Sequence, residues 1–396
     1  MLNLNLDPNL DRIDPSLDVV NYANRALRKA GIKSCIKSGI KNIATITVLV
    51  IMSCYLTIGL AIAPSMAALP TKSAIKDARI ILRNALPIDN EVTRDIQLTL
   101  EQMPRQANLK RWGSLKKDIE TINQELTSNQ AQLISGVNPE LKDAVTEHLS
   151  SLTKALVPLQ EAILIKDRNS VKALSEKALD YVGLVETDYI KEFPFQVPAK
   201  YADLPQLKGR ALVELTTERG SAMITLDGYN APVNAGQFLD LVQKGFYDGL
   251  TFTRADENYY LQTGDPDGDS DGYIDPTTGK DRTVPIEVRV PSQKAPTYGK
   301  TFEEMGLSGT IPVLPFAAFG TVAMAHPNDA PNAGSSQFFI YLFESDLTPA
   351  GLNLLDGNYT VFGYVTEGKE TLYKLRLGDK VLSARVISGA ENLIKP

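Results

Sequence analysis

The sequence predicts a two-domain α+β protein, in which an antiparallel helical bundle precedes a small closed antiparallel β-barrel. Residues 71–192 are rich in Leu, Ile, Ala, Lys, Glu and Gln, and their apolar positions recur at helical spacing. From Gly209 the apolar residues alternate with period two, as in half-buried strands. Three prolines in residues 193–207 separate the two patterns and prevent a helix between them. A length of 396 residues also fits two domains.

An apolar segment near the amino end is typical of an exported protein. Residues 25–41 are basic and contain no acidic residue, and an apolar run follows at residues 43–63. The small residues after this run predict signal-peptide cleavage after Ala67. Because the run is long enough to span a bilayer, an uncleaved anchor is the alternative. The basic flank predicts in both cases that the amino end stays cytoplasmic and the rest is exported.

The chain is accordingly divided into four parts. They are an extension with signal peptide or anchor (1–67), a helical bundle (68–192), a proline-rich linker (193–207) and a barrel (208–396). Five bundle helices are expected, at about residues 71–86, 89–103, 109–134, from Pro139 onward, and 169–190. Short loops between long amphipathic helices predict antiparallel neighbours. Their apolar stripes are most simply the core of the bundle, and the alternative is that the third helix offers its stripe to a partner.

The barrel is expected to begin with a hairpin that turns at Arg219-Gly220, followed by a helix from Pro232 to Lys244. A second helix is expected at residues 367–376. Many short strands with two helices favour a small closed antiparallel barrel. The linker aromatic residues Phe193, Phe195 and Tyr201 need an apolar surface, which either the bundle or a peptide groove of the barrel can supply.

Composition excludes several classes of function. A net charge of −6 argues against a nucleic-acid partner, because phosphate binding needs clustered Lys and Arg. Both cysteines, Cys35 and Cys54, precede residue 68, so the exported part has no disulfide and no cysteine metal site. No cofactor is expected. An acidic insert fits the first part of a calcium-binding loop at Asp267, Asp269, Asp271 and Asp275, but the glutamate expected at its end is absent, so a solvated turn is the alternative.

Four separated motifs occur in the second half of the chain. They are GFYDGLTF-x-R at residues 245–254, QTGDP at 262–266, VAMA with N-x-GSSQFFI at 322–340, and LLDG with VFG at 354–363. In this order they resemble the signature segments of cyclophilins, the prolyl cis/trans isomerase family. The resemblance covers roughly the last 190 residues. It implies an eight-stranded barrel capped by two helices, and peptidyl-prolyl cis-trans isomerase activity.

Isomerisation about a prolyl bond crosses a barrier of about 18–20 kcal/mol and needs neither a nucleophile nor a metal. It needs an apolar pocket for the proline ring and a hydrogen-bond donor aimed at the prolyl nitrogen. The resemblance implies that Arg254 is this donor. The substrate-binding positions that it implies are Phe252, Tyr259, Tyr260, Gln262, Ala325, His326, Gln337, Phe339 and Leu355.

Some positions depart from the pattern of the family. Tyr259 stands where phenylalanine is usual, Tyr260 where methionine is usual, and Leu354 where many members have tryptophan. The two tyrosines narrow and polarise the pocket, while the arginine is retained. Two hypotheses follow: an isomerase with reduced activity, or a catalytically weak or inactive chaperone or binding scaffold.

The order of leader, helical bundle and divergent cyclophilin domain resembles the multidomain cyclophilins of the thylakoid lumen. That resemblance implies a lumenal location, with the periplasm as the alternative, and a role in photosystem II assembly or maintenance. The partners it implies are proline-containing client proteins, photosystem II subunits among them. No nucleic-acid partner is expected, and membrane contact is expected only through the leader.

Overall fold

The computed structural model describes residues 75–135, 137–256, 259–343 and 353–396. The leader, its cleavage site and both cysteines therefore lie outside the described residues. The described residues all belong to one compact unit. Within the described part of the chain, no helix combines the length and the apolar character that a membrane span requires.

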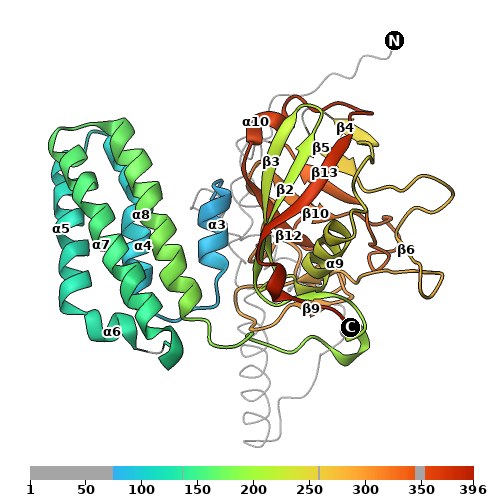
Figure 1. Ribbon diagram of the computed structural model, residues 1–396, viewed down its shortest axis with the longest axis horizontal. Coiled ribbons are helices and arrows are strands. Elements are labelled where there is room, and N and C mark those ends of the chain that lie inside the picture. The colour runs from blue at the N-terminus through green and yellow to red at the C-terminus, as the bar shows by residue number, and fades with distance from the viewer. Residues whose placement is uncertain (1–74, 136, 257–258, 344–352) are drawn as a thin grey trace, which may run out of the picture. The chain divides into compact units, whose positions relative to one another are not determined.

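Four long helices form the bundle, and each runs antiparallel to its neighbours (Figure 1). They are α4 (Glu91–Asn108), α5 (Trp112–Ser128), α7 (Lys142–Leu164) and α8 (Arg168–Asp188), with the short α6 (Gln130–Ile134) and η1 (Pro139–Leu141) between α5 and α7. Their apolar stripes share one core, in which Leu100, Leu115, Leu159 and Val171 are completely buried. The apolar stripes thus form the core of the bundle itself. The stripe of the third expected helix is buried in this core, so it is not offered to a partner.

Two details of the bundle differ from the expectation. The second helix does not end at Pro104 but continues to Asn108, because Met103 and Ala107 bury the same face on both sides of the proline. The third expected helix is divided at Asn129 into α5 and α6, since the backbone of Asn129 leaves the helical region (φ −107°, ψ 22°).

The first expected helix, α3 (Ala78–Ala85), does not contribute to the bundle core. Its buried positions Ala78, Ile81, Leu82 and Ala85 follow helical spacing, and they pack with residues of the carboxy-terminal domain such as Phe316. The expected bundle segment therefore begins with a helix whose buried face packs on the carboxy-terminal domain. An amphipathic stripe shows that one face is buried, but it does not show against what.

A buried ion pair holds α3 to α4 and α8. The Arg94 guanidinium donates to the carbonyl oxygens of Arg83 (2.9 Å) and Leu86 (2.8 Å) and lies 3.0 Å from Glu186 Oε1. Burial raises the pKa of Glu186 to about 7, although Arg94 opposes this. Because Arg94 satisfies the last carbonyl groups of α3 from a neighbouring helix, it fixes the angle at which the chain enters the bundle.

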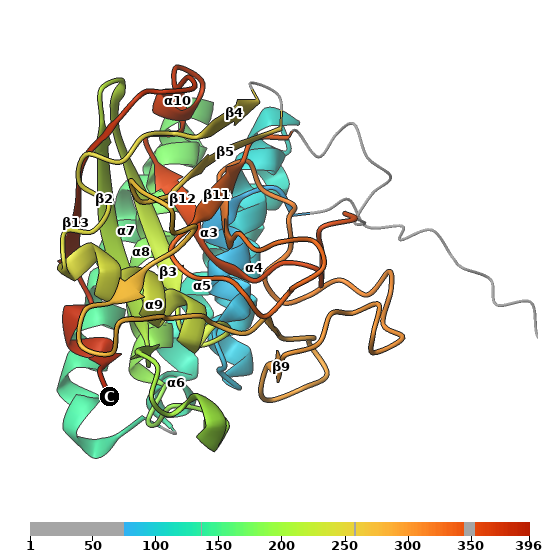
Figure 2. The same cartoon turned by 90° about the vertical axis from the view of Figure 1, so that its right-hand side faces the viewer.

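An eight-stranded antiparallel sheet forms the carboxy-terminal domain and curls into a half-barrel (Figure 2). Its strands in spatial order are β13 (Val381–Ser388), β2 (Arg210–Thr217), β3 (Gly220–Asp227), β12 (Val361–Glu367), β10 (Thr321–Met324), β11 (Phe338–Tyr341), β5 (Tyr260–Thr263) and β4 (Arg254–Asp256). The prediction of eight antiparallel strands is thus confirmed.

The prediction of a closed barrel was wrong, because the edge strands β13 and β4 do not pair with each other. The segment just before β4 approaches the start of β13 instead, through an isolated bridge between Thr251 and Lys380 and short backbone hydrogen bonds such as Phe252 N to Asp379 O (2.9 Å). Of the two expected capping helices, α9 (Pro232–Gln243) has twelve residues, whereas α10 (Lys369–Leu372) is a single turn. The second cap is thus not confirmed.

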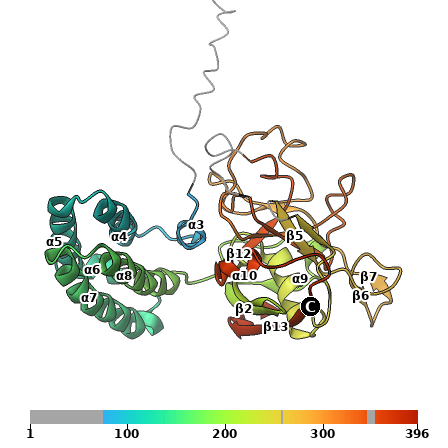
Figure 3. The ribbon, with the colours of Figure 1, turned by 90° about the horizontal axis from the view of Figure 1, so that it is seen from above.

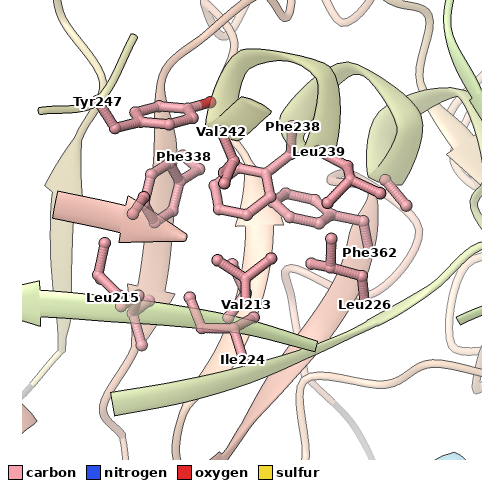
Figure 4. Close-up of a cluster of buried hydrophobic side chains, with 14 of the residues drawn as sticks. Val213, Leu215, Ile224, Leu226, Phe238, Leu239, Val242, Tyr247, Phe338 and Phe362 are labelled. Atoms are coloured by element: carbon pink, nitrogen blue, oxygen red, sulfur yellow. The ribbon is translucent and has the colours of Figure 1, made fainter. Parts of the chain in front are cut away.

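The main core lies between the concave face of the sheet and α9 (Figure 4). Phe238 of α9 contacts Phe338 edge-on at 5.0 Å between ring centroids and Phe362 at 5.2 Å. Alternation along β11 sends Phe338 and Ile340 into this core, while Phe339 belongs to the cluster on the outer face. This sorting decides which side chains can reach a ligand outside the half-barrel.

The linker packs on the carboxy-terminal domain and outside its groove. Phe193 stacks on Tyr229 at 6.3 Å, and Tyr201 contacts Tyr298 at 5.5 Å between ring centroids. The hypothesis that linker residues fill a peptide groove is therefore wrong, and so is packing on the bundle alone. Short two-stranded ladders complete the domain: β1 (Gln206–Leu207) with β14 (Leu393–Ile394), β6 (Ile274–Asp275) with β7 (Lys280–Asp281), and β8 (Glu287–Val288) with β9 (Thr297–Tyr298).

The packing of α3 leads to a prediction about stability. Ile81 is 3% exposed in the outer apolar cluster, whereas the adjacent Ile80 is only half-buried. Ile81→Ala should lower the free energy of unfolding by about 2–4 kcal/mol, because it removes buried methyl groups and leaves a cavity. The same substitution at Ile80 is the matched control and should cost about 1 kcal/mol or less. Urea unfolding followed by circular dichroism measures both; equal losses would contradict the placement of α3.

Candidate active site

Three neighbouring strands place the predicted site residues in one row on the outer face of the half-barrel. Arg254 of β4 is the register partner of Gln262 of β5, and Gln262 is the partner of Phe339 of β11. Directly opposite residues of antiparallel strands point to the same face. Since adjacent strands lie about 5 Å apart, the Arg254 and Phe339 backbones are separated by about 10 Å.

Aromatic rings form the floor of the site around Phe339, which is 7% exposed. Phe316 stacks parallel to it at 5.8 Å, Tyr359 meets it edge-on at 5.3 Å, and Tyr260 lies at 6.0 Å between ring centroids. Leu355 packs against the same cluster. An apolar depression with aromatic walls suits the ring of a proline, which has no polar atom to satisfy.

A chain of side-chain amides forms one wall of the site. Gln262 Nε2 donates to Gln337 Oε1 at 2.7 Å, and Gln337 Nε2 donates to Asp265 Oδ1 at 3.1 Å and to the Asp271 carbonyl oxygen at 2.8 Å. Burial and the nearby Asp271 raise the pKa of Asp265. The acidic loop thus holds the Gln262 side chain through Gln337, and this fixes the position of Gln262 beside Arg254.

The arginine itself is exposed at the rim of the site. Of the described residues, Tyr260 is its hydrogen-bond partner, through an Nη1-to-hydroxyl contact of 3.3 Å. That distance is long for a hydrogen bond to oxygen. Among the described residues, no other group occupies the remaining donors of the guanidinium fork, which lies next to the aromatic floor.

His326 fastens the opposite wall. Nδ1 lies 2.8 Å from the carbonyl oxygen of Pro327, and Nε2 lies 2.8 Å from that of Asn358. Its ring stacks on Tyr359 at 4.4 Å between centroids. A neutral imidazole carries a single N–H, so it can donate to only one of these carbonyl groups at a time. Burial raises the pKa of Tyr359, with Tyr260 adding to the effect and Arg254 opposing it, so its hydroxyl is neutral at neutral pH.

These elements enclose an open groove of about 810 Å³. Nine of the ten predicted site residues line it: Arg254, Tyr259, Tyr260, Gln262, Ala325, His326, Gln337, Phe339 and Leu355. The tenth, Phe252, is completely buried in the main core and does not reach the groove. We therefore assign Phe252 to the core, which corrects the expectation that it binds substrate.

The groove also extends beyond the predicted residues. Its far part is lined by Asp269, Asp271, Asp281, Thr283 and Ser335. Sequence reasoning treated the first two as a metal loop and did not single out the others. The GSSQ run before β11 is the sequence feature that could have indicated this part of the groove. Its Ser335 Oγ accepts a hydrogen bond from the Tyr273 amide at 2.9 Å, which holds the acidic loop against the groove.

The calcium hypothesis for the acidic insert is not supported. Within the described residues, no group of three or more His, Cys, Asp or Glu side chains converges closely enough to hold a metal ion. Asp275 Oδ1 instead accepts from the backbone amides of Thr277 (2.8 Å) and Thr278 (3.3 Å), as in a self-capped turn. Asp267, Asp269 and Asp271 therefore belong to a solvated loop, of which the last two border the groove.

An exposed guanidinium beside an aromatic depression on the outer face of a half-barrel defines a peptide-binding site of the prolyl isomerase type. Residues 212–390 match the family described as cyclophilin type peptidyl-prolyl cis-trans isomerase/CLD. Residues 77–190 match the family described as peptidyl-prolyl cis-trans isomerase CYP38-like, PsbQ-like domain. The chain belongs to the cyclophilin-type peptidyl-prolyl cis-trans isomerase family, and the predicted resemblance is confirmed.

Curated relatives share both domains. The chain is 45% identical over 329 residues to the putative thylakoid lumen peptidyl-prolyl cis-trans isomerase sll0408 of Synechocystis sp., covering 83% of this chain and 87% of that protein. It is 40% identical over 344 residues to peptidyl-prolyl cis-trans isomerase CYP38, chloroplastic, of Arabidopsis thaliana, covering 84% and 78%. Identity to CYP37, chloroplastic, of the same plant is 28% over 362 residues, covering 85% and 75%.

The loop that carries Leu355 leads to a pH prediction. The Asp356 carboxylate accepts from the Phe316 amide at 2.8 Å, and burial raises its pKa to about 7 from an ordinary 3.8. The folded state therefore holds a proton that the unfolded state loses above about pH 4, so stability falls as pH rises from about 4 to 7. Asp356→Asn keeps an acceptor for Phe316 and removes this titration.

We expect wild type to lose about 3 kcal/mol relative to Asp356→Asn between pH 4.5 and pH 8. Urea unfolding at the two pH values measures the difference. Glu186 and Glu287, whose pKa values are also raised to about 7, are present in both proteins and cancel in the comparison. A difference that does not change with pH would show that Asp356 ionises normally in the folded state.

Proposed function

We propose that this protein catalyses cis/trans isomerisation of prolyl bonds in exported proteins. The observation that carries the proposal is the position of Arg254 at the rim of the aromatic depression, one strand from Gln262 and two from Phe339. A peptide lying in the groove places its proline ring over Phe339. The guanidinium then faces the prolyl nitrogen, and Gln262 holds the adjacent backbone.

The chemistry asked of these residues is electrostatic. As the prolyl bond twists, resonance is lost and the nitrogen gains a lone pair, which can accept a hydrogen bond from Arg254. Such a bond is stronger in the twisted state than in the planar one, so it lowers the barrier. Arginine suits this role because it stays charged and presents a fixed fork of donors.

We further propose that turnover is slower than in cyclophilins that have the usual pocket. Tyr260 contributes a hydroxyl that accepts from Arg254, and a substrate must replace this contact. Leu354, at the position where many members have tryptophan, is 92% exposed and is not among the residues that line the groove. The same two observations favour the second candidate, a scaffold that binds proline-containing segments with little catalysis.

We propose the thylakoid lumen as the compartment and photosystem II assembly or maintenance as the process. Two observations support this. The relatives that share both domains are named as thylakoid lumen or chloroplastic proteins. The helical part matches a domain described as PsbQ-like. The clients would then be proline-containing lumenal proteins, with photosystem II subunits among them.

Arg254→Ala should abolish catalysis and keep the fold. In a coupled peptide assay on residues 69–396, kcat/KM should fall by about 100-fold or more, the size expected when a transition-state donor is removed. The melting temperature should stay unchanged, because the side chain is exposed. Lys294→Ala, an exposed cation outside the groove, is the control. If the Arg254 variant turned over the peptide as fast as an active wild type, the mechanism assigned to Arg254 would be wrong. No measurable turnover by wild type itself would favour the scaffold function.

Tyr260→Phe should raise kcat/KM by about 3- to 10-fold, because it frees the guanidinium from a hydrogen bond worth roughly 1 kcal/mol. Tyr259→Phe is the matched control: it removes a neighbouring hydroxyl that has no hydrogen-bond partner in the described part of the chain. The same peptide assay measures both variants. Identical rates for wild type and Tyr260→Phe would mean that this hydroxyl does not limit turnover.

A further inference from the structure

The turn between α4 and α5 ends its helix in an unusual way. The Arg111 amide donates to the Gln106 carbonyl oxygen at 2.9 Å, and the Lys110 amide donates to that of Ala107 at 3.0 Å. This pattern is a Schellman motif, in which one residue adopts the left-handed conformation and is usually glycine. Here that residue is Lys110, with φ of 57°. The residue before it, Leu109, is 53% exposed.

The turn between α7 and α8 repeats the same arrangement. The Asp167 amide donates to the Ala162 carbonyl oxygen at 2.9 Å, and the Lys166 amide donates to that of Ile163 at 3.2 Å. Lys166 has φ of 60°. The residue before it, Ile165, is 75% exposed, which makes it equivalent to Leu109 in both position and exposure.

Lys110 and Lys166 are the two non-glycine residues with positive φ in the described part of the chain. A side chain in this conformation costs folding free energy that glycine would not, and fourteen glycines of the described residues do have positive φ. Lysine at each of these two equivalent positions therefore makes the folded state less stable than glycine would. This cost is understandable if the lysine side chains serve another purpose.

Both turns lie at the same end of the bundle, because α4 and α7 run in one direction and α5 and α8 in the other (Figures 1 and 3). We call this end the basic tip. It consists of Leu109, Lys110, Arg111, Leu164, Ile165, Lys166 and Arg168, all of which are exposed. Within the described part of the chain, no residue covers its large aliphatic side chains, although exposed apolar groups on soluble surfaces are usually isolated.

Positive charge is concentrated at the basic tip. Residues 105–117 and 161–172 together contain eight Lys or Arg and two Asp or Glu, in a chain whose net charge is −6. Among the described ion pairs, none involves Lys110, Arg111, Lys166 or Arg168. The tip therefore carries an excess of positive charge that is suited to an anionic surface.

We propose that the basic tip docks on an anionic lipid bilayer. Aliphatic side chains on projecting turns can enter the headgroup region, while flanking Lys and Arg contact lipid phosphates or sulfates. A protein partner is less well matched, because protein interfaces concentrate their binding energy in packed aromatic and arginine anchors that exclude water. At the tip Trp112 packs against the bundle core instead. Membrane contact, expected only through the leader, then has a second source in the exported domain.

Sedimentation with vesicles tests this proposal on residues 69–396, a compact unit that lacks the apolar run of the leader. Wild type should bind vesicles of equimolar phosphatidylglycerol and phosphatidylcholine at low salt, and should not bind pure phosphatidylcholine. Four charge reversals at the tip, Lys110→Glu, Arg111→Glu, Lys166→Glu and Arg168→Glu, should weaken binding by at least about 50-fold, since each cation near an anionic surface contributes about 5-fold.

The matched control reverses four exposed lysines elsewhere in the helical region: Lys142→Glu, Lys154→Glu, Lys177→Glu and Lys191→Glu. Its net charge equals that of the tip variant, yet it should keep most of the binding. Leu109→Ser with Ile165→Ser should weaken binding while all charges remain. Equal losses in the tip variant and the control would reduce the effect to net charge and overturn the proposal.

A second variant pair separates docking from folding. Lys110→Gly with Lys166→Gly relieves both left-handed lysines, so the melting temperature should rise by a few degrees. Vesicle binding should fall in the same protein by about 10-fold or more. Loss of both stability and binding would mean that the lysines are structural. If wild type ignores vesicles but binds soluble poly-glutamate through the tip, the partner is an acidic polypeptide and the lipid proposal is wrong.

Discussion

The register between β5, β11 and β10 is the constraint on which the rest of the structure depends. Because side chains alternate along a strand, a slip of one residue would exchange the two faces of the sheet. In the observed register Phe338 and Ile340 fill the core against α9, while Phe339 faces outward beside Gln262 and Arg254. The same pairing thus sets both the stability of the half-barrel and the geometry of the groove. Neither can change without the other.

The outer face serves two purposes through one apolar cluster. Phe316 stacks on Phe339 beneath the groove, and the same cluster contains Ile81 and Leu82 of α3. The helix that precedes the bundle therefore packs in the same apolar cluster as the floor of the groove. Arg94 then joins this helix to the bundle through the carbonyl group of Leu86. In energetic terms, the aromatic floor is stabilised by residues from both ends of the described chain.

The row of Arg254, Gln262 and Phe339 was predictable, because each belongs to a motif through which the sequence resembles cyclophilins. Phe252 was misplaced because it belongs to the same motif as Arg254, whereas the structure buries its side chain in the main core. Closure of the barrel and the partner of α3 depend on contacts between segments far apart in the chain. No local pattern encodes such contacts.

An open edge is consistent with the chemistry of the site. The hydrogen bonds between the two ends of the sheet stop at Phe252, two residues before Arg254. Had this pairing continued, a further strand would lie beside β4 and crowd the guanidinium from the side opposite Gln262. Edge strands expose backbone groups and are usually protected by charge or by short length. The strand β4 is three residues long and begins with arginine, so one residue both protects the edge and presents its charge to a peptide.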